Sequence, residues 1–262
     1  MIEVSGLTVS YERNTVVRDF SSIFEKGKIT TIIGPNGSGK STVLKAVSRV
    51  IKKDKGDVIF CDTNINNIPR KALAKRLAFL MQTNITPYNF SVKQLVSYGR
   101  IPHQKWYELK DEKHDEVVDW AMEQCNLKHM EDRLVVSLSG GERQKVWIAV
   151  AIAQKPEVLL LDEPTTYLDI CHQLEIMQLV KQLNVQHNIT VVMVLHDLNQ
   201  AAQFSDNVLV IKDGDIVDYG APKEVITKEL LEDVYSIEAE IGFNENINSI
   251  YVTPISIKNR AI

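Results

Sequence analysis

The pattern of apolar and polar residues predicts strands and helices that alternate along most of the chain. Residues 2–24 alternate loosely between apolar and polar positions around a turn at 12–14, which predicts two antiparallel strands. An apolar run at 29–33 predicts a third strand, and the continuous apolar runs at 158–161 and 189–195 are typical of buried strands. We therefore expect an α/β fold that combines a mostly parallel core sheet with an antiparallel β subdomain.

Helical spacing marks several segments between these strands. Apolar residues recur at the i, i+3, i+4 and i+7 positions of one predicted helix: Ile176, Leu179, Val180 and Leu183. A polar, helix-rich stretch at about 84–135 predicts a helical subdomain inserted into the α/β core, with one apolar stripe formed by Val117, Val118, Ala121, Met122 and Cys125. The other predicted elements are helices at 43–50, 71–76, 139–153 and 223–235, strands at 57–60, 77–81, 208–212 and 216–219, and a hairpin around 244–246.

Composition and charge narrow the class of protein. The chain has 262 residues, of which 44% are hydrophobic and 24% are charged, and a net charge of -4, as is typical of a soluble globular protein. Its longest apolar stretch, at 146–153, is far shorter than the roughly 18–20 residues of a membrane-spanning helix. The start of the chain lacks a secretory signal pattern, and Cys61, Cys125 and Cys171 lack metal-like spacing, so we expect a cytosolic protein with reduced thiols. The sequence has no basic run or stripe that would predict a nucleic-acid partner.

Residues 34–42 read Gly-Pro-Asn-Gly-Ser-Gly-Lys-Ser-Thr and match the phosphate-binding loop pattern G-x-x-x-x-G-K-[ST]. The match lies between an apolar strand and a helix, which is the context that the pattern requires. Its glycines would let backbone N–H groups turn inward to cradle the charges of a nucleoside triphosphate. Lys40 adds a positive charge, and the Ser41 hydroxyl could hold Mg2+. A glycine-rich turn without a ligand is the alternative, but every fixed position of the pattern is present, so we predict nucleotide binding.

Polar side chains follow three of the predicted strands. Asp162 and Glu163 come directly after the strand at 158–161, and open α/β sheets bind ligands at such strand ends. We expect Asp162 to hold Mg2+ through water and Glu163 to polarise an attacking water. His196 follows the next buried strand and could donate a hydrogen bond to charge developing on the γ-phosphate, or could cap a helix. Gln82 is a candidate sensor of Mg2+ or of the attacking water, or an ordinary surface glutamine.

A second glycine-bearing turn comes later in the chain, where residues 138–144 read Leu-Ser-Gly-Gly-Glu-Arg-Gln. Ser139 and Glu142 have the S-x-x-E spacing of a capping box at the start of a helix. Gly140 and Gly141 would each cost about 1 kcal/mol in a helix interior, which suggests that another group approaches the backbone closely. A helix N-terminus is an anion site. We therefore predict a second phosphate-facing site, which would need another copy of the chain to supply its complementary half.

Residues 138–144 resemble the signature motif of ATP-binding cassette (ABC) ATPases, and the other motifs follow in that family's order over residues 2–220. The resemblance implies a P-loop NTPase fold of the ABC type, with an ATPase domain at 1–220 that a C-terminal helix and hairpin at 221–262 extend. It also implies that two copies close head to tail on two ATP molecules. The phosphate loop of one copy would then face the signature serine and glycines of the other.

The resemblance also implies a role for each candidate residue. Tyr11 would stack on adenine, and the phosphates would be contacted by Asn36, Gly37, Ser38, Gly39, Lys40, Ser41 and Thr42. Mg2+ would be held by Ser41, Asp162 and Gln82, the lid-loop glutamine. Hydrolysis would use Glu163 as the general base and His196 as the switch histidine, together with Lys40 and Gln82. The half-site for the second copy would come from Ser139, Gly140, Gly141, Glu142 and Asp169, the last being the aspartate that couples the two sites.

Two departures from the family pattern remove no group that hydrolysis needs. Glu142 stands where glutamine is usual, and residues 166–169 read Thr-Tyr-Leu-Asp where Ser-Ala-Leu-Asp is common.

Three further stretches narrow the resemblance to one branch of the family. Residues 98–103, residues 165–170 with His172 and Gln173, and residues 196–202 are similar to the ATPases of iron–siderophore, haem and cobalamin importers. Those ATPases act with a membrane permease dimer and, indirectly, with an extracytoplasmic substrate-binding protein. The helices after the lid-loop glutamine would form the groove that receives the permease. The resemblance thus implies a peripheral protein at the cytoplasmic face of the cell membrane that powers an importer, with an iron chelate favoured as the cargo.

Two other functions are compatible with a phosphate loop. A soluble ABC ATPase that acts on DNA or ribosomes usually carries a long coiled coil or two cassettes in one chain, and this sequence has neither. A small-molecule kinase would not need residues 138–144, and it would transfer phosphate to an acceptor rather than to water.

Overall fold

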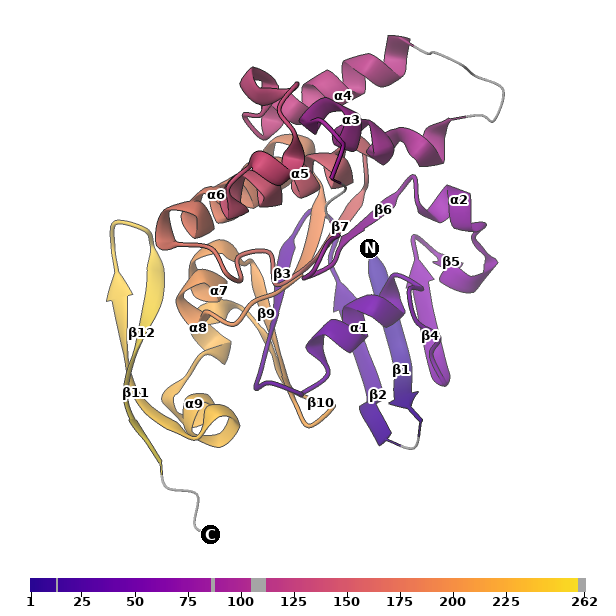
Figure 1. Ribbon diagram of the computed structural model, residues 1–262. Helices are drawn as coiled ribbons and strands as arrows, with labels where there is room; N and C mark the ends of the chain where they lie inside the picture. The colour runs from indigo at the N-terminus through magenta and orange to yellow at the C-terminus, as the bar shows by residue number, and fades with distance from the viewer. Residues whose placement is uncertain (13, 86–87, 105–111, 259–262) are drawn as a thin grey trace. The chain divides into compact units, whose positions relative to one another are not determined.

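The computed structural model describes residues 1–12, 14–85, 88–104 and 112–258 (Figure 1). The chain forms two compact units. The first unit is formed by Met1–Ile65 and Val192–Ile262, and the second by Asn66–Val191. Strand β8 (Thr190–Val194) contains the point at which the chain passes from the second unit back to the first. The phosphate loop and the predicted signature motif therefore belong to different units.

An antiparallel sheet begins the first unit. β1 (Ile2–Tyr11) pairs with β2 (Asn14–Phe24) and with β4 (Lys55–Phe60), and β5 (Thr63–Asn64) completes the order β2-β1-β4-β5. The buried apolar side chains of β1 are Ile2, Val4, Leu7 and Val9, and their alternation changes phase between Val4 and Leu7, where the pairing with β2 shifts register. The two antiparallel strands predicted over 2–24 are confirmed, while residue 13 of their turn lies outside the described residues.

A parallel pair of strands supports the phosphate loop in the same unit. β3 (Ile29–Ile33) runs parallel to β9 (Asn207–Lys212), which is antiparallel to β10 (Asp215–Gly220). Every residue of β3 is buried, as its apolar run suggests. The helix predicted at 43–50 is α1 (Lys40–Val47), which begins within the loop motif itself.

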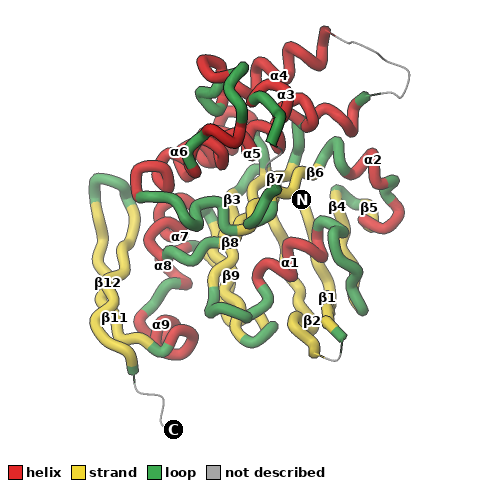
Figure 2. The backbone as a smooth tube through the Cα atoms, in the orientation of Figure 1, coloured by secondary structure: helices red, strands yellow, loops and turns green. Residues whose placement is uncertain are grey.

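The C-terminal part of the first unit contains α7 (Leu198–Phe204), α8 (Pro222–Val225), α9 (Lys228–Tyr235) and the strands β11 (Ile237–Asn244) and β12 (Ser249–Ile257). β11 and β12 pair antiparallel, which confirms the predicted hairpin (Figure 2). The single helix predicted at 223–235 is wrong. The backbone of Ile226 (φ -81°, ψ 87°) leaves the helical region, and the Thr227 hydroxyl starts a new helix by accepting a hydrogen bond from Leu230 N at 3.1 Å.

The second unit combines a short parallel sheet with several helices. β6 (Leu77–Leu80) runs parallel to β7 (Val158–Asp162), whose five residues are all buried. Its α-helices are α2 (Arg70–Leu73), α3 (Val92–Ser97), α4 (Glu112–Gln124), α5 (Gly140–Ala153) and α6 (Ile170–His187). Short 3-10 helices lie at Ile65–Asn67, which starts at the unit boundary, and at Tyr98–His103, Lys128–Met130 and Val135–Ser137.

The helices predicted as an insert belong to this second unit. The apolar stripe on and just after α4 is confirmed, because Val118, Ala121, Met122 and Cys125 are buried and Val117 is half-buried. The unit also contains β6, β7 and α6, so it is larger than the predicted insert at about 84–135, and the boundaries of that insert stay a prediction. Within the ranges that the structure describes, no helix combines the length and the apolar character needed to cross a membrane.

Candidate active site

The phosphate loop connects β3 to α1 through a backbone that requires glycine at two points. Gly34 has φ 148° and Gly39 has φ 99°, values that other residues rarely adopt. A Cβ on Gly34 would lie 1.9 Å from the Ile211 carbonyl oxygen, and a Cβ on Gly39 would lie 2.8 Å from the Val16 carbonyl oxygen. No side chain caps α1, so the N–H groups of its first turn can face an anion.

Lys40 and Ser38 are buried polar side chains of the loop. Lys40 is 5% exposed, and its Nζ donates hydrogen bonds to the carbonyl oxygens of Gly34 (2.9 Å) and Pro35 (2.8 Å). Ser38 is 3% exposed, and its hydroxyl has no hydrogen-bond partner among the described residues. Leaving a buried hydroxyl unpaired costs about 1–3 kcal/mol. The Ser38 hydroxyl therefore fits a site where a ligand oxygen completes its hydrogen bonding.

Two further predicted residues lie in the first unit. Tyr11 stands at the end of β1 and is half-exposed. His196 is exposed in the turn between β8 and α7. The cap of α7 is Asp197, whose carboxylate accepts hydrogen bonds from Asn199 N (2.8 Å) and Gln200 N (3.0 Å). His196 is therefore not the cap of this helix.

In the second unit, strand register brings Gln82 and Glu163 together. Leu80 of β6 pairs with Leu161 of β7, so the residue two positions beyond each strand partner lies at the same edge of the sheet. The Gln82 Nε2 atom donates a hydrogen bond to Glu163 Oε2, and the Thr166 hydroxyl donates another to the same oxygen at 3.0 Å. The half-buried Glu163 also has φ 53°, an uncommon conformation that costs energy and is often found at functional sites.

Asp162 and Thr166 complete this edge of β7. Asp162 is the last residue of the strand rather than the first residue after it, and it is only 2% exposed. Sequence reasoning gave Thr166 no role, since its contact with the Glu163 carboxylate depends on the turn that follows the strand.

The turn at the start of α5 is a closed capping box, as predicted. The Ser139 hydroxyl accepts a hydrogen bond from Glu142 N at 3.2 Å, and the Glu142 carboxylate accepts one from Ser139 N at 2.7 Å. The Ser139 backbone donor lowers the pKa of Glu142, and Arg133 forms a longer ion pair with it at 3.7 Å. Glu142, which stands where the family usually has glutamine, therefore closes the capping box in this chain.

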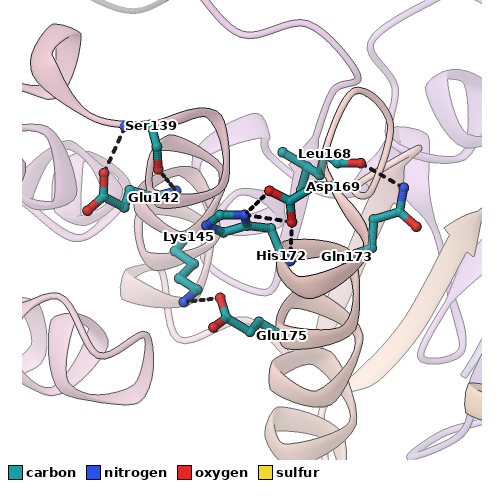
Figure 3. A network of polar contacts seen from close by, with 8 residues as sticks. All are labelled: Ser139, Glu142, Lys145, Leu168, Asp169, His172, Gln173 and Glu175. Atoms are coloured by element: carbon teal, nitrogen blue, oxygen red, sulfur yellow. Dashed lines mark hydrogen bonds and ion pairs between the residues drawn. The ribbon is translucent and has the colours of Figure 1, made fainter.

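The start of α6 lies against this turn (Figure 3). A Cβ on Gly141 would lie 2.1 Å from His172 Cδ2, which identifies the group that approaches the backbone closely. Asp169 is the N-cap of α6 and accepts hydrogen bonds from both the backbone and the ring of His172. His172 was predicted only as part of a family resemblance, and its contact with Gly141 was not predicted.

The predicted site residues divide between the two units. The first unit holds Tyr11, His196 and the loop at 36–42, in which Asn36 and Gly37 are exposed, Ser41 is half-buried and Thr42 is buried. The second unit holds Gln82, Asp162, Glu163, Asp169 and the signature residues Ser139, Gly140, Gly141 and Glu142. The geometry within each unit fits the predicted roles, which stay predictions.

A protein-family model described as "ABC transporter" matches residues 17–166, which is more than half of the chain. The chain belongs to the ABC transporter family. Two relatives align with this cassette over more than nine tenths of the chain. The Petrobactin import ATP-binding protein FpuC of Bacillus anthracis is 43% identical over 241 residues, covering 92% of this chain and 89% of the relative. The Iron(3+)-hydroxamate import ATP-binding protein FhuC of Bacillus subtilis (strain 168) is 43% identical over 259 residues, covering 98% and 96%.

A solved structure extends the likeness to the fold. It is the dimeric post-hydrolysis state of the ATP-binding cassette MJ0796 bound to ADP and Pi, with a TM-score of 0.74 and 27% identity over 85% of this chain and 99% of that one. The cassette thus has the predicted ABC-type P-loop NTPase fold, with a mixed, mostly parallel core sheet and an antiparallel β subdomain. It is an ABC ATPase that couples ATP hydrolysis to transport. The small-molecule kinase considered above is excluded.

Proposed function

We propose that this cassette is the ATP-hydrolysing subunit of an importer whose cargo is an iron–siderophore complex. The observation that carries the proposal is the likeness, over about nine tenths or more of the chain, to two import proteins, one named for petrobactin and one for iron(3+)-hydroxamate. The stretches at 98–103 and 196–202, which resemble the iron-chelate branch, support it. Both relatives are named for import, which favours a transporter over an ATPase that acts on DNA or ribosomes.

The phosphate loop would bind the triphosphate of ATP. Backbone N–H groups of residues 36–42 can surround the phosphates, and the Lys40 ammonium would add charge to that cradle. A phosphate oxygen would give the buried Ser38 hydroxyl its partner. Tyr11, half-exposed at the end of β1, would stack on adenine.

The carboxylates after β7 would carry out hydrolysis. Ser41, Asp162 and Gln82 offer oxygen ligands, and Mg2+ favours sites with one or two carboxylates plus substrate phosphates. Mg2+ bound there would neutralise charge on the phosphates. Glu163 would accept a proton from the attacking water, with its carboxylate oriented by the amide of Gln82 and the hydroxyl of Thr166. His196 would donate a hydrogen bond to the γ-phosphate.

Two copies of the cassette would close head to tail on ATP. The Ser139 oxygen accepts a hydrogen bond from Glu142 N, so its hydroxyl hydrogen can be donated to a phosphate of the second copy's nucleotide. Gly140 and Gly141 would let that phosphate approach the helix start, and Asp169 would couple the two sites. A solved cassette of similar fold is a dimer bound to ADP and Pi, which supports dimerisation of this cassette.

The further partners would be a membrane permease dimer and, through it, an extracytoplasmic substrate-binding protein. The helices after Gln82 would receive the permease, so the cassette would lie at the cytoplasmic face of the membrane. Hydrolysis would reopen the dimer, and the permease would follow that movement.

The general-base assignment can be tested with Glu163→Gln. We expect this variant to bind ATP, to lose at least about 100-fold in turnover, and to accumulate as an ATP-bound dimer in gel filtration, because an amide cannot take the proton from water. Glu157→Gln is the matched control, since Glu157 comes just before the same strand and its carboxylate pairs with Arg76 at 2.6 Å. Normal turnover by Glu163→Gln would show that the assignment is wrong.

The cargo can be tested through the permease. Purification of the tagged cassette from solubilised membranes should recover a polytopic permease, and the reconstituted complex should take up an iron–hydroxamate complex in preference to haem or cobalamin. Preferential uptake of haem or cobalamin would show that the importer belongs to the same branch of the family but carries a different cargo. Recovery of only nucleic acid or ribosomes would contradict the importer proposal.

A further inference from the structure

One imidazole ring lies between two regions of the cassette that have separate predicted roles. His172 stands in the first turn of α6, and Figure 3 shows its ring between the start of α5 and Asp169. The Nδ1 atom is 2.9 Å from both carboxylate oxygens of Asp169. The backbone N–H of His172 donates to the same carboxylate at 2.9 Å, and these donors lower the pKa of Asp169. Because an ionised carboxylate only accepts hydrogen bonds, Nδ1 is the donor.

The ring leaves no room for a side chain on Gly141. A Cβ there would lie 2.1 Å from Cδ2 and 2.4 Å from Cγ of His172, whereas a Cβ on Gly140 would make only an ordinary contact with Leu168 at 3.6 Å. Neither glycine has a positive φ. Gly141 therefore provides space for the ring, and it does not serve a left-handed turn.

A separate contact already joins the two helices. Lys145 of α5 and Glu175 of α6 form an ion pair at 2.7 Å, about one turn further along each helix (Figure 3). That pair involves neither the carboxylate of Asp169 nor the backbone of the signature turn. The ring of His172 does connect these two regions, because it bonds to the Asp169 carboxylate and packs against Gly141.

We propose that His172 is a positioning residue that joins the signature turn to Asp169, so that both regions meet the second copy of the cassette as one rigid body. The inference rests on the proposed head-to-tail dimer. If either region moved alone, the hydrogen bonds to the Asp169 carboxylate would break or a gap would open beside Gly141. Because the two regions are ordered before the copies meet, closure loses less conformational entropy.

Three substitutions separate the two contacts of the ring. His172→Phe keeps a flat ring against Gly141 but has no donor for Asp169. His172→Asn keeps an N–H group near the position of Nδ1 but removes most of the ring. His172→Ala removes both contacts. Glu175→Gln is the matched control, because it weakens another polar contact between the same helices and leaves His172 in place.

The experiment measures the ATP-dependent monomer–dimer equilibrium of these variants in a Glu163→Gln background by analytical ultracentrifugation. We expect the dimer dissociation constant to rise about 10-fold or more for His172→Ala and by a smaller factor for His172→Phe and His172→Asn, in the range of ordinary coupling effects. Glu175→Gln should stay within about twofold of its parent. ATP affinity of the monomers should not change, since the phosphate loop is untouched.

The outcomes separate this inference from the proposed function. If Glu163→Gln with native His172 forms no ATP-dependent dimer, the head-to-tail dimer is wrong and the inference falls with it. If that parent dimerises and the His172 variants dimerise equally well, only the inference is overturned. It is also overturned if weaker dimerisation merely follows a smaller folded fraction, measured by thermal unfolding of each variant.

Discussion

The phosphate loop before α1 and the signature turn at the start of α5 both place glycines beside a helix N-terminus, but for different physical reasons. In the phosphate loop, Gly34 and Gly39 adopt positive φ values, and neighbouring backbone carbonyls leave no space for a Cβ. In the signature turn the glycines have ordinary backbone angles, and Gly141 is crowded by the ring of His172. The phosphate loop needs glycine because its backbone adopts positive φ values. The signature turn needs glycine because α6 packs closely against α5.

The two helices also differ in whether a side chain caps the N-terminus. No side chain caps α1, so its first-turn N–H groups can bind an anion directly. The start of α5 is closed by the capping box of Ser139 and Glu142, which uses two backbone donors. An anion at α5 would therefore rely on the Ser139 hydroxyl and on the backbone donors that the box leaves. The uncapped start of α1 therefore fits direct anion binding, whereas the capped start of α5 fits a supporting role.

The largest effect expected from this comparison concerns Gly34→Ala. The new Cβ would meet the Ile211 carbonyl oxygen at 1.9 Å with φ at 148°, so we expect a loss of more than about 3 kcal/mol in the free energy of unfolding and no measurable ATP binding. Gly37→Ala is the matched control. Its φ is also positive, at 81°, but no atom outside its chain neighbours lies within 4 Å of the new Cβ, so we expect a loss of about 1–2 kcal/mol in the free energy of unfolding. Urea unfolding and ATP titration measure both. Equal losses for the two variants would show that close approach does not matter here.

A smaller effect should separate the two glycines of the signature turn. Gly140→Ala should raise the free energy of unfolding by up to about 1 kcal/mol, since alanine favours helix and meets only Leu168. Gly141→Ala should lower it by about 1–3 kcal/mol through overpacking against His172. Adding His172→Ala to Gly141→Ala should recover most of that loss, and a double-mutant cycle measures the coupling. Strictly additive effects would mean that the ring does not determine the choice of glycine.

Much of the fold could be predicted because local sequence determines it. The strand at 158–161 is a continuous apolar run, and it forms the buried strand β7 with one residue added, Asp162. The helix at 223–235 could not be predicted correctly, because its apolar spacing continues through the break. That break depends on one backbone angle at Ile226 and on the hydroxyl of Thr227.

Less of the candidate site could be predicted, because it depends on contacts between residues that lie far apart in the sequence. Motif spacing predicted Gln82 and Glu163 as separate candidates, but their hydrogen bond joins residues 81 positions apart and depends on the register of β6 and β7. The two glycines of the signature turn correctly indicated that something approaches closely. Which residue approaches is decided by how α5 packs on α6, so no local pattern around Gly141 could identify His172.

The smallest expected effect concerns the Glu142 carboxylate. It tests whether the negative charge of this group stabilises the capping box at the start of α5. The Ser139 backbone donor lowers the folded-state pKa of Glu142 below its unfolded value of about 4.3, so the carboxylate stabilises the fold above that pH, and this contribution is lost as pH falls through the lower folded-state value. Glu142→Gln keeps an acceptor but loses the charge near the helix N-terminus. It should cost about 0.3–1 kcal/mol at neutral pH, and this difference from the native protein should shrink below about pH 4.

Ser139→Ala is the control for this last measurement, because it removes the hydroxyl that accepts from Glu142 N and should cost about 1 kcal/mol at every pH. Denaturant unfolding followed across the acid range compares the three proteins. A difference between Glu142→Gln and the native protein that is near zero at every pH would show that the carboxylate acts only as a neutral acceptor could. The charge of Glu142 would then not stabilise the start of α5, and the usual glutamine would serve this cassette equally well.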